Sequence, residues 1–343
     1  MTTATATRTR DRVVPFTAGD GLQSTLINVR GEAEPTRGPV ILVHGAGVRA
    51  EIFRAPVRQT IVEALVEAGY DVWLENWRAS IDVAPNLWDL DQAARYDHPA
   101  AVQRVVQETG ADTVQAIIHC QGSTSFTMSV MAGLVPEVKT VVSNAVSLHP
   151  VIPDIARLKM RAMLPITRPI LDYMNPQWGN HAPSLLAKAL NAFVNLTHRE
   201  CDNAVCKWSS FTYGVGFPTL WRHENLNDET HEWLRHEFAE VPRTFFAQML
   251  RCLDRGHLVS TGEVEGLPRD FAADPQTEAR FALFAGEQNR CFLPASQTRT
   301  HHYMERRGMR SSLHVIPGYG HLDIFMGQRA AQDVFPLILR ELD

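Results

Sequence analysis

The residue that could most clearly take part in a chemical reaction is Cys120, in the stretch 113–125. It stands within His119-Cys-Gln-Gly-Ser123, after an apolar run typical of a buried strand and before a run typical of a helix. A residue at such a tight turn is lifted above the sheet, and the first turn of the following helix favours a thiolate. A thiolate beside a histidine attacks acyl carbon and forms a thioester intermediate. The sequence therefore predicts nucleophilic catalysis through Cys120.

Two further residues follow Cys120 in the order that a catalytic triad requires. Asn289 comes shortly after a later apolar strand, where an acid is usual, and His321 ends a glycine-rich loop after the last expected strand. An amide can hold a histidine ring in one tautomer, and a thiol needs less help to ionise than a hydroxyl. His321 is the predicted base and Asn289 its predicted partner. Glu287 and Asp323 are alternative candidates for the third position, although Asp323 also fits a helix cap.

Two backbone N–H groups are predicted to stabilise the oxyanion that forms on the substrate. One belongs to Gln121, directly after the nucleophile, and the other to Ala46, in a glycine-rich turn after a buried strand. His44 and His119 are expected to be structural, with their rings bonded to nearby backbone. His149 ends a strand on the same edge of the sheet, so it is a candidate pocket residue.

The elements that must position these residues alternate between strand and helix. Short apolar runs predict strands, and apolar residues at helical spacing predict helices. The alternation stops near residue 150 and resumes near 280, which predicts an α/β fold with a mostly parallel, doubly wound sheet. The expected strands are 13–16 and 22–29, joined as a hairpin, then 39–43, 71–74, 113–118, 138–147, 280–284 and 312–316, and the expected helices are 56–68, 93–108, 294–307 and one from 322.

The segment 151–270 interrupts this alternation. It has no convincing strand period and is rich in aromatic residues. Residues 13–150 and 271–343 are expected to form one α/β core, because neither half could bury its sheet alone. The segment 151–270 is then a helical cap inserted after the sixth strand. Residues 1–12, rich in Thr and Arg, are predicted to be a disordered tail.

Composition argues against several classes of function. The 343 residues are 45% hydrophobic with a formal net charge of −5, and this mild acidity argues against nucleic-acid binding. We expect no membrane span and no secretory signal, because no apolar run is long enough for the first and none stands at the N-terminus. Five cysteines without such a signal indicate reduced thiols in the cytoplasm. Cys201 and Cys206 are expected to be inert thiols rather than zinc ligands or a disulfide, and no metal or cofactor is expected. The sequence does not indicate an oligomeric state.

Together these features resemble the α/β-hydrolase superfamily over residues 13–343. The resemblance implies that the turn 119–123, here called the elbow, matches G-x-S-x-G with Cys120 in place of serine. The chain departs from that pattern at Ile118, where a glycine is usual, and at Asn289, where the family usually has an acid. Three motifs are similar to those of acid lipases, namely Gly69-Tyr-Asp-Val-Trp-Leu74, Tyr96-Asp-His-Pro-Ala100 and Gly320-His-Leu-Asp323.

A closer resemblance is to the hydrolase-like domain that accompanies cholesterol-oxidase-type (GMC) oxidoreductases. The elbow cysteine is also similar to that of polyhydroxyalkanoate synthases, with little further likeness. The chain has no flavin-binding G-x-G-x-x-G, so any oxidoreductase would be a separate protein. The GMC-associated resemblance is carried by the elbow, the segment Cys201 to Cys206, His223-Glu-Asn-Leu226 and Thr230-His231.

Three hypotheses of function follow. The first is an enzyme that cleaves an ester or thioester of a bulky apolar compound, free or carrier-bound, through an acylated Cys120. The second keeps the acyl-enzyme but passes the acyl group to a nucleophile other than water, as in an acyltransferase, a cyclase or a C–C bond-forming enzyme. The third is a binding protein on a hydrolase fold that has lost catalysis, for which Asn289 is the main argument.

Overall fold

Over residues 8–167 and 169–343, which the computed structural model describes, one eight-stranded sheet forms the core, in the order β1-β2-β4-β3-β5-β6-β9-β10. The expected hairpin forms its edge, and the remaining strands run parallel. All residues of β3 are buried, as their apolar character predicts, and all residues of β4 are buried too, although Asp71, Glu75 and Asn76 are polar. The strands are β1 (Arg10–Thr17), β2 (Gln23–Arg30), β3 (Pro39–Val43), β4 (Asp71–Asn76), β5 (Val114–His119), β6 (Val138–Asn144), β9 (Arg280–Gly286) and β10 (Ser311–Ile316).

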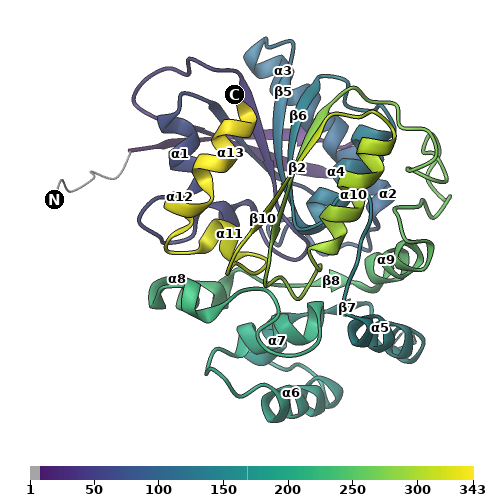
Figure 1. Cartoon of the computed structure of the whole chain (residues 1–343). Coiled ribbons are helices and arrows are strands. Elements are labelled where there is room, and N and C mark those ends of the chain that lie inside the picture. The colour runs from purple at the N-terminus through teal and green to yellow at the C-terminus, as the bar shows by residue number, and fades with distance from the viewer. Residues whose placement is uncertain (1–7, 168) are drawn as a thin grey trace.

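Helices cover both faces of this sheet. The first and last helices of the core, α1 and α13, lie on one side of the sheet, and α4 and α10 lie on the other (Figure 1). This two-sided cover makes the sheet doubly wound, as predicted. The core helices are α1 (Ile61–Glu67), α2 (Leu90–Gln92), α3 (His98–Thr109), α4 (Cys120–Met131), α10 (Ala295–Arg306), α11 (Asp323–Met326), α12 (Ala330–Asp333) and α13 (Phe335–Leu342).

Several boundaries differ from the expected ones for local reasons. Helix α1 begins at Ile61 rather than at 56, because Thr60 and Glu63 form a reciprocal capping box. The helix expected over 93–108 opens with one π-helical turn, η2 (Ala93–Asp97), before α3. At the N-terminus, residues 10–12 of the expected tail pair with β2 as part of β1. Residues 1–7 of that tail lie outside the described residues.

The segment 151–270, here called the cap segment, lies between β6 and β9 and gathers below the sheet in Figure 1. It is mainly helical, but a two-residue antiparallel pair, β7 (Tyr173–Met174) and β8 (Val241–Pro242), was not expected from the sequence. Its helices are α5 (Asp154–Thr167), α6 (Leu185–Thr197), α7 (Ala204–Tyr213), α8 (Asp228–Trp233) and α9 (Arg243–Arg255), with short helices η3 (Pro176–Gly179), η4 (His223–Asn225) and η5 (Leu234–His236).

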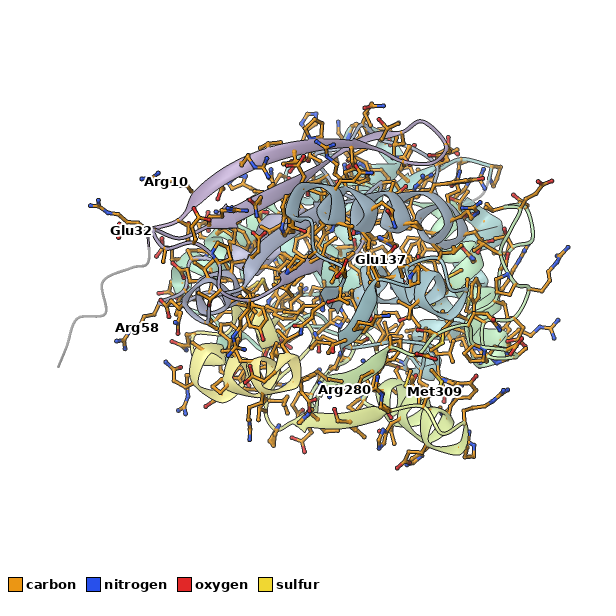
Figure 2. All side chains as sticks on the ribbon, turned by 90° about the horizontal axis from the view of Figure 1, so that it is seen from above. Arg10, Glu32, Arg58, Glu137, Arg280 and Met309 are labelled. Atoms are coloured by element: carbon orange, nitrogen blue, oxygen red, sulfur yellow. The ribbon has the colours of Figure 1, made fainter. Side chains whose placement is uncertain are left out.

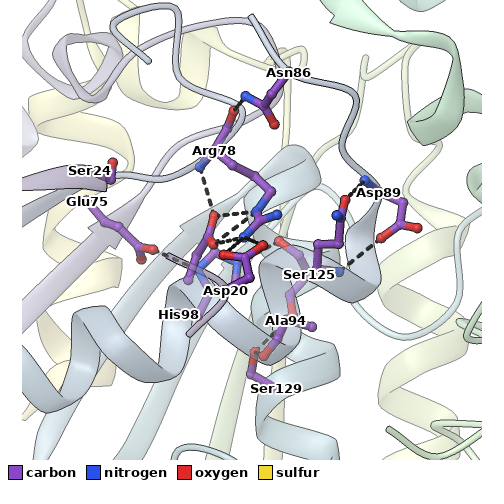
Figure 3. Close-up of polar contacts among 12 residues, drawn as sticks. Asp20, Ser24, Glu75, Arg78, Asn86, Asp89, Ala94, His98, Ser125 and Ser129 are labelled. Carbon is purple, nitrogen blue, oxygen red and sulfur yellow. Dashed lines mark hydrogen bonds and ion pairs between the residues drawn. The ribbon is translucent and has the colours of Figure 1, made fainter. Parts of the chain in front are cut away.

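Behind the elbow, one buried polar chain ties a strand to two helices. The His98 ring lies between Glu75 of β4, at 2.9 Å from Nδ1 to Oε1, and Ser125 of α4, at 2.7 Å from Nε2 to Oγ (Figure 3). Glu75 and His98 are fully buried, and burial raises the pKa of Glu75. Because these polar atoms bond one another, they fix the orientation of α4 and so of the elbow.

An ion-pair network beside this chain carries a stability prediction. The Arg78 guanidinium is 3% exposed and bonds both carboxylate oxygens of Asp97, at 2.5–3.0 Å, and Asp20 at 3.0 Å (Figure 3). Removing the Asp97 charge leaves the buried Arg78 guanidinium paired only with Asp20, whose side chain is 28% exposed. Asp97→Asn should therefore lower the free energy of unfolding by roughly 3 kcal/mol, measured by urea denaturation. Asp11→Asn, which breaks a pair with Arg54 at a 39% exposed carboxylate, should change it by less than about 1 kcal/mol. Equal losses in both variants would contradict the argument.

The surface carries charges of both signs. Exposed side chains such as Arg10, Glu32 and Arg58 point outward at the rim of the molecule (Figure 2). Within the described residues, no helix combines the length and the apolar character needed to cross a bilayer.

Candidate active site

The elbow forms as the sequence predicts, between β5 and α4. Cys120 has a φ of 56°, in the left-handed region that residues other than glycine rarely adopt. Glycine is required beside it, because a Cβ on Gly122 would lie 2.1 Å from the carbonyl oxygen of His44, and one on Gly45 would lie 2.9 Å from the Cβ of Cys120. Ile118, which replaces the first glycine of the motif, is fully buried in β5. The turn therefore presents the thiol at the carboxyl edge of the sheet.

The structure brings Cys120, His321 and Asn289 together. A ring nitrogen of His321, the Sγ of Cys120 and a ring nitrogen of His119 all lie within 4.8 Å of one another. His321 stands in the loop between β10 and α11, and its Nδ1 lies 3.1 Å from Nδ2 of Asn289, in the loop after β9. The other ring nitrogen, Nε2, is buried and has no hydrogen-bond partner among the described residues. Nε2 is thus the nitrogen left to serve Cys120.

The amide of Asn289 has a fixed direction. Its Oδ1 accepts hydrogen bonds from the backbone N–H groups of Cys291, at 3.0 Å, and Phe292, at 3.1 Å. The NH₂ group is therefore the part that faces His321, and it donates to Nδ1. A neutral ring held this way carries its proton on Nε2. The amide therefore favours a tautomer with no lone pair facing Cys120.

Cys291 is a site residue that the sequence analysis missed. Burial opposes ionisation of Cys120, yet a hydrogen bond from the Cys291 thiol and the adjacent His321 hold the pKa of Cys120 well below its usual range. The same hydrogen bond and burial raise the pKa of Cys291, whose Sγ also lies 3.6 Å from the carbonyl oxygen of Tyr213. In the sequence, the only sign that Cys291 belongs to the site is its position two residues after Asn289.

The two predicted oxyanion donors stand at the elbow. Ala46 is buried in the turn after β3, where its carbonyl accepts a 2.8 Å hydrogen bond from the Tyr213 hydroxyl. Its N–H donates to no acceptor within the described part of the chain. Gln121 lies in the first turn of α4, where an N–H has no helical acceptor, and its N–H hydrogen-bonds the Cys120 thiol, which helps to lower the pKa of that thiol. The N–H of Ala46 is thus available to a substrate oxygen, whereas the N–H of Gln121 is bonded to the candidate nucleophile itself.

The two histidines that flank these donors are buried and bonded within the protein. Nδ1 of His44 lies 2.7 Å from the carbonyl oxygen of Gly45, and burial lowers the pKa of His44 to about 3. Contrary to expectation, the ring of His119 bonds a side chain rather than backbone, with its Nδ1 2.9 Å from Nδ2 of Asn144. Burial also lowers the pKa of His119 well below its usual value. The ring of His119 is nevertheless 4.7 Å from that of His321, so it forms part of the site wall.

The alternative third residues bond elsewhere. The Glu287 carboxylate accepts from the N–H of Gly318 at 3.3 Å. Asp323, whose pKa is raised by burial, accepts from the N–H of Gly320 at 2.9 and 3.0 Å and from Asn225 at 2.6 Å. Asp323 therefore fixes the loop that carries the catalytic histidine candidate rather than its ring. The sequence indicated that Asp323 could cap a helix, but its side chain does not cap α11.

His149 lies away from the site, contrary to expectation. Its N–H and its Nδ1 lie 3.1 and 3.2 Å from Oγ1 of Thr300, and its ring packs against Tyr303. Burial lowers the pKa of His149 to about 4. These contacts to α10 turn the side chain away from the cavity described next.

An apolar cavity opens beside the elbow, between the core and the cap segment. Lys159 is a half-buried cation in its wall, bonded to the carbonyl oxygens of Phe211 and Gly214, and burial lowers the pKa of Lys159 to about 8. Most of the wall is aliphatic or aromatic, so it suits an apolar group next to Cys120. The core contributes Gln121, Cys291 and Phe292, and the cap segment contributes residues that include Met160, Met163, Leu164, Leu171, Met174, Phe211, Tyr213, Phe245, Phe246 and Met249.

This sheet, with an elbow after β5 and a histidine loop after β10, defines an α/β-hydrolase fold, and the chain has that fold. An esterase from Thermogutta terrifontis, with malate bound, is similar in structure, with a TM-score of 0.57 at 15% identity over 96% of this chain and 98% of that chain. The predicted fold is therefore confirmed.

Curated relatives point to the same superfamily. Sterol esterase 2 of Saccharomyces cerevisiae is 30% identical over 115 residues, which are 30% of this chain and 21% of that protein. Human lipase member K is 21% identical over 301 residues, which are 79% of this chain and 70% of that protein. The match to the yeast esterase thus spans about a fifth of its length. No family model matches the chain. Fold and relatives together support membership of the α/β-hydrolase superfamily.

Proposed function

We propose that the protein transfers acyl groups, cleaving an ester or thioester of a bulky apolar compound through an acylated Cys120. One observation carries the proposal: a strained elbow presents a thiol of lowered pKa between His321, Cys291 and the backbone N–H groups of Ala46 and Gln121. The names of the relatives, a sterol esterase and lipases, support ester chemistry.

The first chemical step follows from this arrangement. The Cys120 thiolate attacks the acyl carbon, and the carbonyl electrons move to the oxygen, where the N–H groups of Ala46 and Gln121 stabilise the negative charge. When the tetrahedral species collapses, the bond to the leaving group breaks and its electron pair departs with that group. The acyl group remains on Cys120 as a thioester.

The direction of the Asn289 amide favours thioesters over esters as substrates. A departing thiolate is stable near neutral pH without a proton, whereas an alkoxide needs one. When Asn289 donates to Nδ1, the His321 ring is neutral and carries its one proton on Nε2. If His321 donated that proton to the leaving group, the ring would become an anion. Turning the amide would leave the N–H groups of Cys291 and Phe292 unpaired, at about 1–3 kcal/mol each.

The same feature favours the second hypothesis, transfer to a nucleophile other than water. Attack by water needs a base, and the neutral ring that Asn289 selects has no lone pair at Nε2. The apolar cavity beside the elbow also disfavours bulk water near the acyl-enzyme. A thiol or an amine depends less on a base than water does, so it would remove the acyl group from Cys120 faster.

We include in the proposal a reducing compartment such as the cytoplasm, which fits five free cysteines.

Mass spectrometry of the intact protein tests the proposal. A panel of esters and thioesters that share the same acyl chains is incubated with the protein, and the mass added to Cys120 is followed with time. We expect acylation, faster from thioesters, with slow loss in water and faster loss when a thiol or amine is added. Cys120→Ala should abolish the adduct, whereas Cys252→Ala, which removes a buried thiol of α9, should keep it. Absence of any Cys120 adduct across the panel would overturn the acyl-enzyme and leave the binding-protein hypothesis.

A further inference from the structure

Four metal-ligating side chains meet in the cap segment, outside the candidate active site. One ligand atom from each of Cys201, Cys206, His223 and His231 lies within 4.8 Å of all the others. They come from three separate places: the approach to α7 and its first turn, η4, and α8. The sequence analysis treated Cys201 and Cys206 as inert thiols, because the chain has no second cysteine pair with zinc-ligand spacing.

The four side chains bring their ligand atoms nearly as close together as a metal site requires. Sγ of Cys206 lies 3.3 Å from Nε2 of His223, and the rings of His223 and His231 pack with centroids 4.9 Å apart. Nε2 of His231 is buried and has no hydrogen-bond partner within the described residues. Tetrahedral zinc, with bonds of about 2.3 Å to sulfur and 2.0 Å to nitrogen, needs ligand atoms less than about 4 Å apart, so movements of about 1 Å would close the site.

Surrounding residues hold these ligands in place. Asn203 accepts on Oδ1 from the N–H of Cys206 at 3.1 Å, and its Nδ2 donates to the carbonyl oxygen of His231 at 2.6 Å. One side chain thus fixes two of the four ligands from different helices. Cys206 is fully buried and the other three are partly buried, so solvent access is limited.

We propose that Cys201, Cys206, His223 and His231 bind one structural Zn²⁺ ion. Two thiolates and two imidazoles in tetrahedral array are the donors that zinc prefers, whereas Mg²⁺ and Ca²⁺ require oxygen ligands. Four protein ligands leave no open position for a substrate, which makes the site structural rather than catalytic. The proposal does not depend on the function proposed for Cys120.

The position of the site indicates what the ion stabilises. Two residues after His223, Asn225 donates to the carbonyl oxygen of Gly318 at 2.9 Å and to Asp323 at 2.6 Å, in the loop that carries His321. Next to His231, Thr230 donates to the carbonyl oxygen of Pro56 in the core. The ion would therefore stabilise the region of the cap segment around Asn225 and Thr230, which bonds to the core beside the candidate active site.

Metal analysis and cobalt spectroscopy of the full chain test this inference. Purified protein should contain one zinc per chain, and Co²⁺ exchanged into it should give the visible bands and thiolate charge-transfer absorption of a tetrahedral S₂N₂ site. Cys201→Ser, which changes a partly exposed loop residue, should lose the ion and lower the melting temperature, and so should His231→Ala. Cys252→Ala, which removes a buried thiol outside the cluster, should retain one zinc.

A second control separates this cluster from the active-site group of His119, Cys120 and His321, whose ligand atoms are also close together. Cys120→Ala should keep one zinc and an unchanged cobalt spectrum. Three results would overturn the inference: wild-type protein without stoichiometric zinc and without a tetrahedral cobalt spectrum, zinc that is lost in Cys120→Ala but kept in Cys201→Ser, or a Cys201–Cys206 disulfide in peptide mapping. The wild-type measurements decide even if a variant fails to fold.

Discussion

Free acid should leave acylated Cys120 at least about tenfold faster when Asn289 is replaced by aspartate. One carboxylate oxygen would still accept from the N–H groups of Cys291 and Phe292, as Oδ1 of asparagine does. The second oxygen would replace the NH₂ group and accept a hydrogen bond from the Nδ1–H group of His321, which keeps the ring proton on Nδ1. Nε2 then has a lone pair and can take a proton from water, as in a conventional triad. The measurement is single-turnover release of acid from preformed acyl-enzyme, in wild type and Asn289→Asp.

The matched control is Asn195→Asp, which adds the same charge on an exposed position of α6. It should leave the release rate unchanged. The gain in Asn289→Asp should disappear as the pH falls through the pKa of the new carboxyl, because the protonated acid no longer accepts from Nδ1. A folded Asn289→Asp protein that releases acid no faster than wild type would show that the amide does not limit water attack.

Alkylation of Cys120 by iodoacetamide should continue at full rate well below the pH at which an ordinary thiol loses reactivity. Only the thiolate reacts, so the rate falls as pH drops through the pKa of the thiol. For an unperturbed cysteine this begins near pH 8.5, with about a tenfold loss for each further unit. Because the pKa of Cys120 is held well below that range, its rate should exceed that of an ordinary cysteine by about tenfold for each pH unit that separates the two midpoints.

Cys291→Ala identifies the source of this activation. Without the thiol that donates to Cys120, the midpoint of the alkylation profile should move to higher pH, while His321 still provides part of the shift. Cys120→Ala is the control that assigns the labelled peptide. A wild-type midpoint near pH 8.5 would contradict the activated thiol and favour the binding-protein hypothesis.

Much of the fold could be predicted because its signals are local. The five residues of β3 form an uninterrupted apolar run, and all are buried. The capping residue Thr60 and the π-turn before α3 shifted helix boundaries, because side-chain contacts decide where a helix begins. The pair β7–β8 was missed because two residues in extended conformation give no periodicity.

The candidate site was only partly predictable, for a different reason. Strand ends at one edge of a parallel sheet converge, so the order of Cys120, Asn289 and His321 along the chain predicted that they would meet. The direction of the Asn289 amide is set by the N–H groups of the turn at 291–292, which donate to its oxygen. The sequence does not show where those N–H groups point. His149 was placed wrongly because its contact with Thr300 turns the ring away.

The same limit applies to the cluster in the cap segment. Cys206 and His223 are 3.3 Å apart in space although one lies in α7 and the other in η4. No local pattern brings such residues together, since helix packing in the cap segment sets the distance between them. Motifs with short fixed spacings can be found in a sequence, but a ligand set distributed over several elements is visible only after folding.

The backbone conformation of Cys120 has a consequence for how well this chain is optimised for folding. A residue with a side chain in the left-handed region costs on the order of 1 kcal/mol, and glycine would avoid that cost. For stability alone, position 120 would be better occupied by glycine, which has no thiol. The chain therefore gives up folding free energy at the position of the proposed nucleophile, and a compromise between stability and activity of this kind is what the proposed function would require there.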